Sequence, residues 1–201
     1  SMITSASLAG ASGSIAVGTG NGDISGSLNI ATGNGLTNSG DITVSGGSTT
    51  TGQGSSVLIQ AGTSSASTGG MLEVLSGSGK EFSGSIQVLS ADSAASSGNL
   101  LMQSGSAGTG TSGSIEIKTG ASSNGASGSL TLSAGTSAVG SGNQIQIAAG
   151  SSAVAAGADV TISSGSATSE TDPAGDIKIS AGNGAGQTGG AILLSSGSGL
   201  P

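Results

Sequence analysis

The sequence predicts an all-β fold, specifically a β-solenoid (β-helix) of about 13 coils with 14–15 residues per coil and a thin, flattened cross-section. Three observations predict it. Large apolar residues come in pairs separated by one residue, the pairs recur at a nearly constant spacing, and glycine and small residues fill the intervals. Self-similarity at a fixed short period is the sequence signature of repeat architectures.

The apolar pairs have the alternation of a β-strand. In an extended chain, residues two apart point to the same side, so both members of a pair share one face. A helix is disfavoured by this spacing, by the β-branched residues and by a glycine in every turn. Successive first members are 13–17 residues apart, mostly 14 or 15. The pairs are Ile15/Val17, Leu28/Ile30, Ile42/Val44, Val57/Ile59, Leu72/Val74, Ile86/Val88, Leu100/Met102, Ile115/Ile117, Leu130/Leu132, Ile145/Ile147, Val160/Ile162, Ile177/Ile179 and Ile192/Leu194.

Glycine and small residues are in phase with the pairs. Five residues after the first member of each pair there is a glycine, here called the column glycine, and only Ala91 breaks this column. A small residue, such as Thr19 or Ala61, precedes the column position in every repeat. Another glycine usually lies two residues before the next pair, as at Gly84 and Gly113. We expect these glycines at corners, where they permit positive φ and a close approach of two walls.

A single strand of this kind cannot bury its own inner face. Stacked coils bury it and give each backbone N–H and C=O group a partner in the next coil. The residues predicted to point inward from the return wall are Ile24, Ala66, Ala95, Val139 and Val154. We therefore expect two regions, a degenerate first coil with a cloning scar at 1–12 and a single β-solenoid repeat array at 13–201.

Composition excludes most functional classes. The 201 residues include 41 glycines, ten acidic residues and three lysines, with no cysteine or histidine and a net charge of −7. Nucleic-acid binding requires basic side chains, and membrane insertion requires an apolar run that is absent here. Without histidine or cysteine the chain lacks the usual nucleophilic triads and zinc ligands. We expect no enzyme activity and no catalytic, cofactor-binding or metal-binding residues. Few charges and a positive mean hydropathy also argue against a disordered linker.

Calcium and ice are two specific ligands that a small β-solenoid could bind. Asp41, Asp159 and Asp176 directly precede an apolar pair, but in only three of thirteen repeats, so we expect no calcium dependence. An ice-binding face needs a regular column of threonine or similar residues. The residues between the paired apolar positions instead mix leucine, glutamate, glutamine, lysine and threonine. An ice-binding or mineral-templating face therefore stays a second alternative.

Four leucines form a candidate interface. Leu58, Leu75, Leu89 and Leu101 occupy outward positions in repeats four to seven, where stacking would join them into an apolar stripe. Soluble monomers rarely expose such a stripe, which favours side-by-side association of chains. Scattered surface leucines are the ordinary alternative.

Two further departures from the repeat are candidate contacts. The 17-residue interval contains Glu170, Asp172 and Pro173, and proline cannot donate to a ladder, so we expect a loop there. That loop is either a recognition element or a tolerated insertion. The lone aromatic residue, Phe82, either fills a gap between small neighbours or anchors a partner.

The segments Ser-Gly-Ser-Ile-Glu-Ile-Lys-Thr-Gly (112–120) and Ala-Gly-Asp-Ile-Lys-Ile-Ser-Ala-Gly (174–182) resemble Gly/Ser-rich tandem repeats in large secreted or surface proteins of algae and other protists. The resemblance implies a structural or adhesive role on the cell exterior, in a wall or on a particle surface such as a virion. We expect a non-enzymatic structural rod, part of a larger extracellular or surface protein, that self-associates side by side or end to end. An adhesive or ligand-binding surface, for a glycan or a mineral, is the first alternative.

Overall fold

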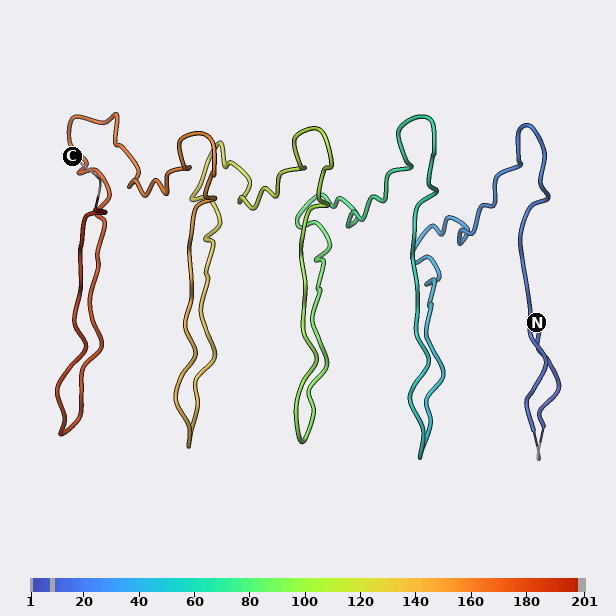
Figure 1. Cartoon of the computed structure of the whole chain (residues 1–201). Coiled ribbons are helices and arrows are strands. Elements are labelled where there is room, and N and C mark those ends of the chain that lie inside the picture. Colours follow the sequence, from blue (N-terminus) through green and yellow to red (C-terminus); the bar gives the residue numbers. More distant parts are fainter. Residues whose placement is uncertain (1, 8–9, 199–201) are drawn as a thin grey trace. The chain divides into compact units, whose positions relative to one another are not determined.

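The computed structural model describes residues 2–7 and 10–198. Neither helix nor strand forms within these residues, and Figure 1 draws the chain there as a plain tube without coiled ribbons or arrows. The β-solenoid predicted from the repeat is therefore wrong, and so is its description as a β-helix. Within the same residues no helix is long and apolar enough to cross a membrane.

The chain divides into two units, Ser1–Leu100 and Leu101–Pro201, and each is described by itself. The division falls inside the pair Leu100/Met102. Both units are built in the same way. An extended segment carries each apolar pair, and the chain then bends before the next pair, in all twelve intervals between the thirteen pairs.

Hydrogen bonding explains why no sheet forms. A folded protein makes about one intramolecular hydrogen bond per residue, most of them between backbone groups. Across residues 2–7 and 10–198 only six backbone–backbone hydrogen bonds occur, and each closes one loop between successive pairs. The segments that carry the apolar pairs contribute none of them. A ladder needs a neighbouring backbone about 4.8 Å away along the whole segment, and that neighbour is missing.

The alternation of side chains within each segment is nevertheless that of an extended backbone. Lys118 Nζ lies 2.9 Å from Glu116 Oε1, and Lys178 Nζ lies 3.3 Å from Asp176 Oδ2. Both ion pairs join residues two apart, which share one side of an extended chain. All four side chains are exposed, so these pairs contribute little to stability.

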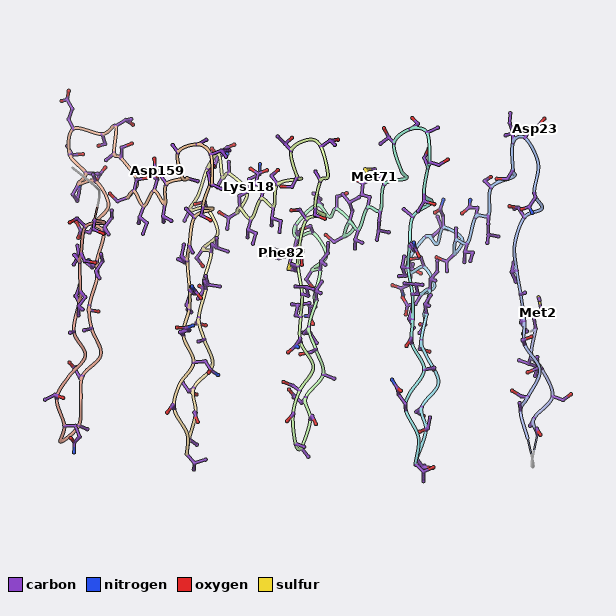
Figure 2. All side chains as sticks on the ribbon, viewed as in Figure 1. Met2, Asp23, Met71, Phe82, Lys118 and Asp159 are labelled. Carbon is purple, nitrogen blue, oxygen red and sulfur yellow. The ribbon has the colours of Figure 1, made fainter. Side chains whose placement is uncertain are left out.

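Burial is slight throughout. The solvent-accessible surface is 19748 Å² for a chain of 18.2 kDa. A compact protein of this mass exposes about 8,100 Å², and its fully unfolded chain about 26,000 Å². No described side chain is buried, and Figure 2 shows side chains projecting from the trace along its length. The described residues therefore form no hydrophobic core.

The apolar pairs still follow a consistent order of exposure. The first members of the pairs are 48–65% exposed and the second members 63–87%, and the first is the less exposed member in every pair. The residues predicted to point inward from a return wall do not do so, because Ile24, Val139 and Val154 are 93–103% exposed and lie at loop bends. Between residues 10 and 198 no strand forms that could serve as an opposite wall.

The column glycines do not use positive φ, contrary to the expectation. Among the described residues only Gly10 and Gly186 have positive φ, at 138° and 88°. Neither lies in the column. A Cβ added to a column glycine would meet nothing within 4 Å in all but one repeat, so the close approach of two chain segments involves the other glycine, two residues before the next pair.

Candidate functional site

Each closed loop begins and ends at the same two positions of the repeat, here called the neck. The carbonyl oxygen of the column glycine accepts a hydrogen bond from the amide that lies two residues before the next pair, at 2.8–3.2 Å. Six necks are closed in this way: Ser55 to Gly47, Gly70 to Gly62, Gly84 to Gly77, Ala158 to Gly150, Gly175 to Gly165 and Gly190 to Gly182. All six obey one register, so the repeat specifies a loop with a defined base.

The small residue before the column position and the glycine before the next pair meet across the neck. A Cβ atom added to that glycine would lie 3.2–3.9 Å from a side-chain carbon of the small residue in ten necks. Ala61, Ser104 and Ala181, all small neck residues, are among the few described residues that are partly buried. The small residue before each column position and the glycine before each next pair therefore recur for one reason, which is their contact at the neck. The ten contacts are Gly13–Thr4, Gly26–Thr19, Gly40–Thr32, Gly70–Ala61, Gly84–Ser76, Gly98–Ser90, Gly113–Ser104, Gly128–Thr119, Gly175–Ser164 and Gly190–Ala181.

Threonine occurs only in necks without the hydrogen bond, although the necks of Ser90 and Ser104 lack it too. The necks that contain Thr19, Thr32 or Thr119 lack the backbone hydrogen bond. In these three necks the side-chain contact from an added Cβ is 3.7–3.9 Å, against 3.4–3.7 Å in the closed necks of Gly70, Gly84, Gly175 and Gly190. Threonine is β-branched and stiff, which disfavours closure of the neck.

One neck shows the complementary arrangement. Here the small residue is Gly46 and the opposite residue is Ser55, so glycine and the larger residue have exchanged sides. Ser55 donates to the Gly47 carbonyl through its amide at 3.2 Å and through Oγ at 2.9 Å. A Cβ on Gly46 would lie 2.9 Å from the Ser55 carbonyl oxygen. The neck is therefore closed with glycine on the opposite side.

Hydroxyl groups organise half of the loop tips. Two residues after the column position, a serine or threonine oxygen accepts a hydrogen bond from an amide two or three residues further on, as in the turns these residues favour. Ser64 accepts from Ser67 at 2.9 Å, and Thr49 accepts from Gly52 at 2.9 Å. The hydroxyl residues with this role are Thr49, Ser64, Ser93, Ser122, Ser137 and Ser152.

Glycine replaces the hydroxyl in four other loops, at Gly22, Gly35, Gly79 and Gly184. In these loops a backbone carbonyl oxygen lies close to the place that a Cβ of this glycine would occupy. A Cβ on Gly35 would collide with the Asn38 carbonyl oxygen, and one on Gly79 would collide with that of Phe82. The same loop position is therefore filled either by a hydroxyl cap or by a glycine that admits a carbonyl.

The loop at 105–113 has neither device, because Ala107 occupies that position. This loop surrounds an open hollow of about 530 Å³ lined by Gln103, Ser104, Gly105, Ser106, Ala107, Gly110 and Ser112. The hollow offers hydroxyl, amide and backbone groups and no charged side chain.

The long loop carries the predicted contact residues Glu170, Asp172 and Pro173, all of which are exposed. Its base is a closed neck, Gly175 to Gly165 at 2.9 Å, and its tip is held by Ser169, which accepts from the Thr171 amide at 3.3 Å. The extra residues thus extend an ordinary loop without changing its base. The two carboxylates lie two residues apart and face solvent.

The four leucines predicted as an interface are exposed, namely Leu58, Leu75, Leu89 and Leu101. Three lie in the first unit and Leu101 begins the second. Phe82 does not fill a gap, because it is 88% exposed in the loop that follows Gly77; Figure 2 labels it. The capping hydroxyls were not predicted from the sequence, although each lies two residues after the column position.

In chemical terms the described surface offers hydroxyls, amides, isolated carboxylates and apolar side chains. No group of three or more acidic residues that could hold a metal ion comes together within the described residues. Comparison with known protein families, with curated proteins and with solved structures gave no match.

Proposed function

We propose that this chain is a non-enzymatic structural repeat protein whose apolar pairs are covered by further copies of the same chain. The observation that carries the proposal is thirteen apolar pairs at a regular spacing, none of them buried. A lone chain that exposes 19748 Å² has far more surface to bury than the 1,200–2,000 Å² or so of a typical stable interface.

A second copy is the partner whose chemistry fits best. Its apolar pairs have the same period as those they would meet, so one contact in register brings the neighbouring pairs into register too. The charge density also permits close approach, because ten acidic residues and three lysines are spread over 201 residues. An assembly of this kind suits a wall, a fibre or a particle surface, and the resemblance of 112–120 and 174–182 to secreted repeats supports that location.

Repeats four to seven should associate most strongly. There the pairs Val57/Ile59, Leu72/Val74, Ile86/Val88 and Leu100/Met102 supply apolar groups to one side of the extended segment. Leu58, Leu75, Leu89 and Leu101 supply them to the other side. A copy bound to one side leaves the second side available, so growth beyond a dimer follows.

The test is the mass in solution across a concentration series, by light scattering and sedimentation. Replacing Leu58, Leu75, Leu89 and Leu101 by serine removes about 1 kcal/mol each if half of each side chain is covered on association. We expect the dissociation constant to rise about a thousandfold.

The matched control replaces Leu36, Val139 and Val154 by serine, because these side chains are as exposed but lie at loop tips outside the pair pattern. We expect little change in the dissociation constant of this control variant. A chain that stays monomeric at every concentration would overturn the proposal, and retention on a glycan array by such a monomer would favour the adhesive alternative.

A further inference from the structure

Four asparagines are followed by glycine, and all lie in exposed loops: Asn21, Asn34, Asn124 and Asn183. Three share one place in the repeat, directly after the column glycines Gly20, Gly33 and Gly182. The fourth lies at the tip of the loop that begins at Gly120. Asparagine before glycine is the pair most prone to lose its side-chain amide, because no Cβ on the following residue hinders ring closure.

The hydrogen bonds of the following amide differ between these loops. In the Asn124 loop the Gly125 amide donates to Ser122 Oγ at 3.1 Å. Within the described chain the amides of Gly22, Gly35 and Gly184 donate to no protein acceptor. The nitrogen that would react is thus engaged in one loop and free in three.

From this difference we infer that Asn21, Asn34 and Asn183 are sites of spontaneous deamidation, and that the Ser122 hydroxyl protects Asn124. The backbone nitrogen of the following glycine loses its proton and attacks Cγ of asparagine. The Cγ–N bond breaks, the side-chain nitrogen leaves as ammonia, and a succinimide forms. Water then opens the ring at either carbonyl, giving isoaspartate or aspartate, with no oxidant or reductant involved.

A hydrogen bond from the glycine amide to Ser122 Oγ slows the first step. The nitrogen keeps its proton while it donates, and the bond must break before the nitrogen can attack Cγ. A net hydrogen bond of ordinary strength corresponds to a rate about two- to tenfold lower at Asn124 than at the other three sites.

The modification changes both charge and backbone. Each deamidation replaces a neutral amide with a carboxylate. Conversion of Asn21, Asn34 and Asn183 therefore takes the net charge from −7 to −10. Isoaspartate also inserts a methylene into the main chain. At Asn183 that insertion lies inside the loop closed by the Gly190 amide and the Gly182 carbonyl, 2.9 Å apart.

The experiment ages the full chain in neutral buffer and follows each asparagine by peptide mapping, with isoaspartate detected separately from aspartate. Asn29, Asn38, Asn99 and Asn143 are internal references, because each precedes a larger residue. We expect Asn21, Asn34 and Asn183 to convert together, Asn124 about two- to tenfold later, and the references last.

Two matched variants isolate the hydroxyl. Ser122→Ala should raise the deamidation rate of Asn124 to that of Asn21, Asn34 and Asn183. Ser137→Ala removes an equivalent cap, on the Gly140 amide at 2.9 Å, from a loop without an Asn-Gly pair and should leave every asparagine unchanged. Equal rates at all four sites in the unaltered chain, or no acceleration in Ser122→Ala, overturn the inference.

Discussion

At the scale of single residues, the loop position two after the column glycine governs the tip of each loop. It holds a hydroxyl that accepts an amide, as at Ser64, or a glycine that lies beneath a carbonyl, as at Gly35. These are two solutions to one requirement, because a tight bend leaves amides and carbonyls that need a partner or space. Where Ala107 provides neither, the loop opens into a hollow.

Substitution of Gly35 should rearrange its loop. A Cβ at this position collides with the Asn38 carbonyl oxygen, so Gly35→Ala must move backbone rather than a flexible side chain. We expect NMR chemical-shift changes throughout residues 34–39. The control in the same loop is Gly33→Ala, because an added Cβ there meets nothing within 4 Å. Equally small changes in both variants would count against the loop geometry.

At the scale of the element, the repeat is a loop with a neck at which two small residues face each other. Closed necks pair glycine with alanine or serine, place glycine on the other side as at Gly46 and Ser55, or pair Ala149 with Ala158. Threonine occurs only in necks that lack the hydrogen bond. The position of each neck could be predicted from the two small-residue columns, although their contact with each other could not, since a column shows only that a position must be small.

Exchanging neck residues should therefore open or close individual loops. Ala61→Thr places a β-branched side chain beside Gly70 and should break the 2.8 Å hydrogen bond from the Gly70 amide to the Gly62 carbonyl. Thr119→Ala should allow the Gly128 amide to form the equivalent bond. Since an ordinary net hydrogen bond contributes about 0.5–1.5 kcal/mol, amide exchange at Gly70 should quicken about two- to tenfold.

The readout is hydrogen exchange resolved at single amides, with Gly190 in the unaltered chain as a reference for a closed neck. Opposite shifts at Gly70 and Gly128 are required by the size argument. Unchanged exchange in both variants would show that the neck hydrogen bond does not respond to the facing side chain.

At the scale of the whole molecule, the chain lies much closer to an unfolded chain than to a compact protein in exposed surface. Low charge and a positive mean hydropathy predicted order, yet each repeat of 14–15 residues brings only two large apolar side chains to one face. That burial is small beside the conformational entropy of ordering the repeat, so a single chain does not close a core.

The far-ultraviolet circular dichroism of the dilute chain should accordingly be that of coil, without a sheet minimum. The measurement belongs at the lowest concentration at which light scattering gives a monomer. A sheet spectrum from that monomer would contradict the structure.

Association should strengthen as salt is added. Each copy carries a net charge of −7, so copies repel one another, and ions screen that repulsion over about 10 Å at 0.1 M ionic strength. Sulfate should act more strongly than chloride, because it also favours apolar burial. Sedimentation at several salt concentrations tests this, and dissociation on adding salt would mean that ion pairs hold the copies together.

The sequence by itself determined the repeat, its period and the alternation of side chains within each paired segment. Pairs such as Ile86/Val88 predict a locally extended backbone, because the alternation of side chains between two sides depends only on neighbouring residues. The tertiary structure alone decided that, within residues 2–7 and 10–198, no segment pairs with the next and backbone–backbone hydrogen bonds form only at the necks. The physical reason is that sheet formation depends on a second segment arriving alongside, and a local pattern cannot specify whether that segment comes from the same chain.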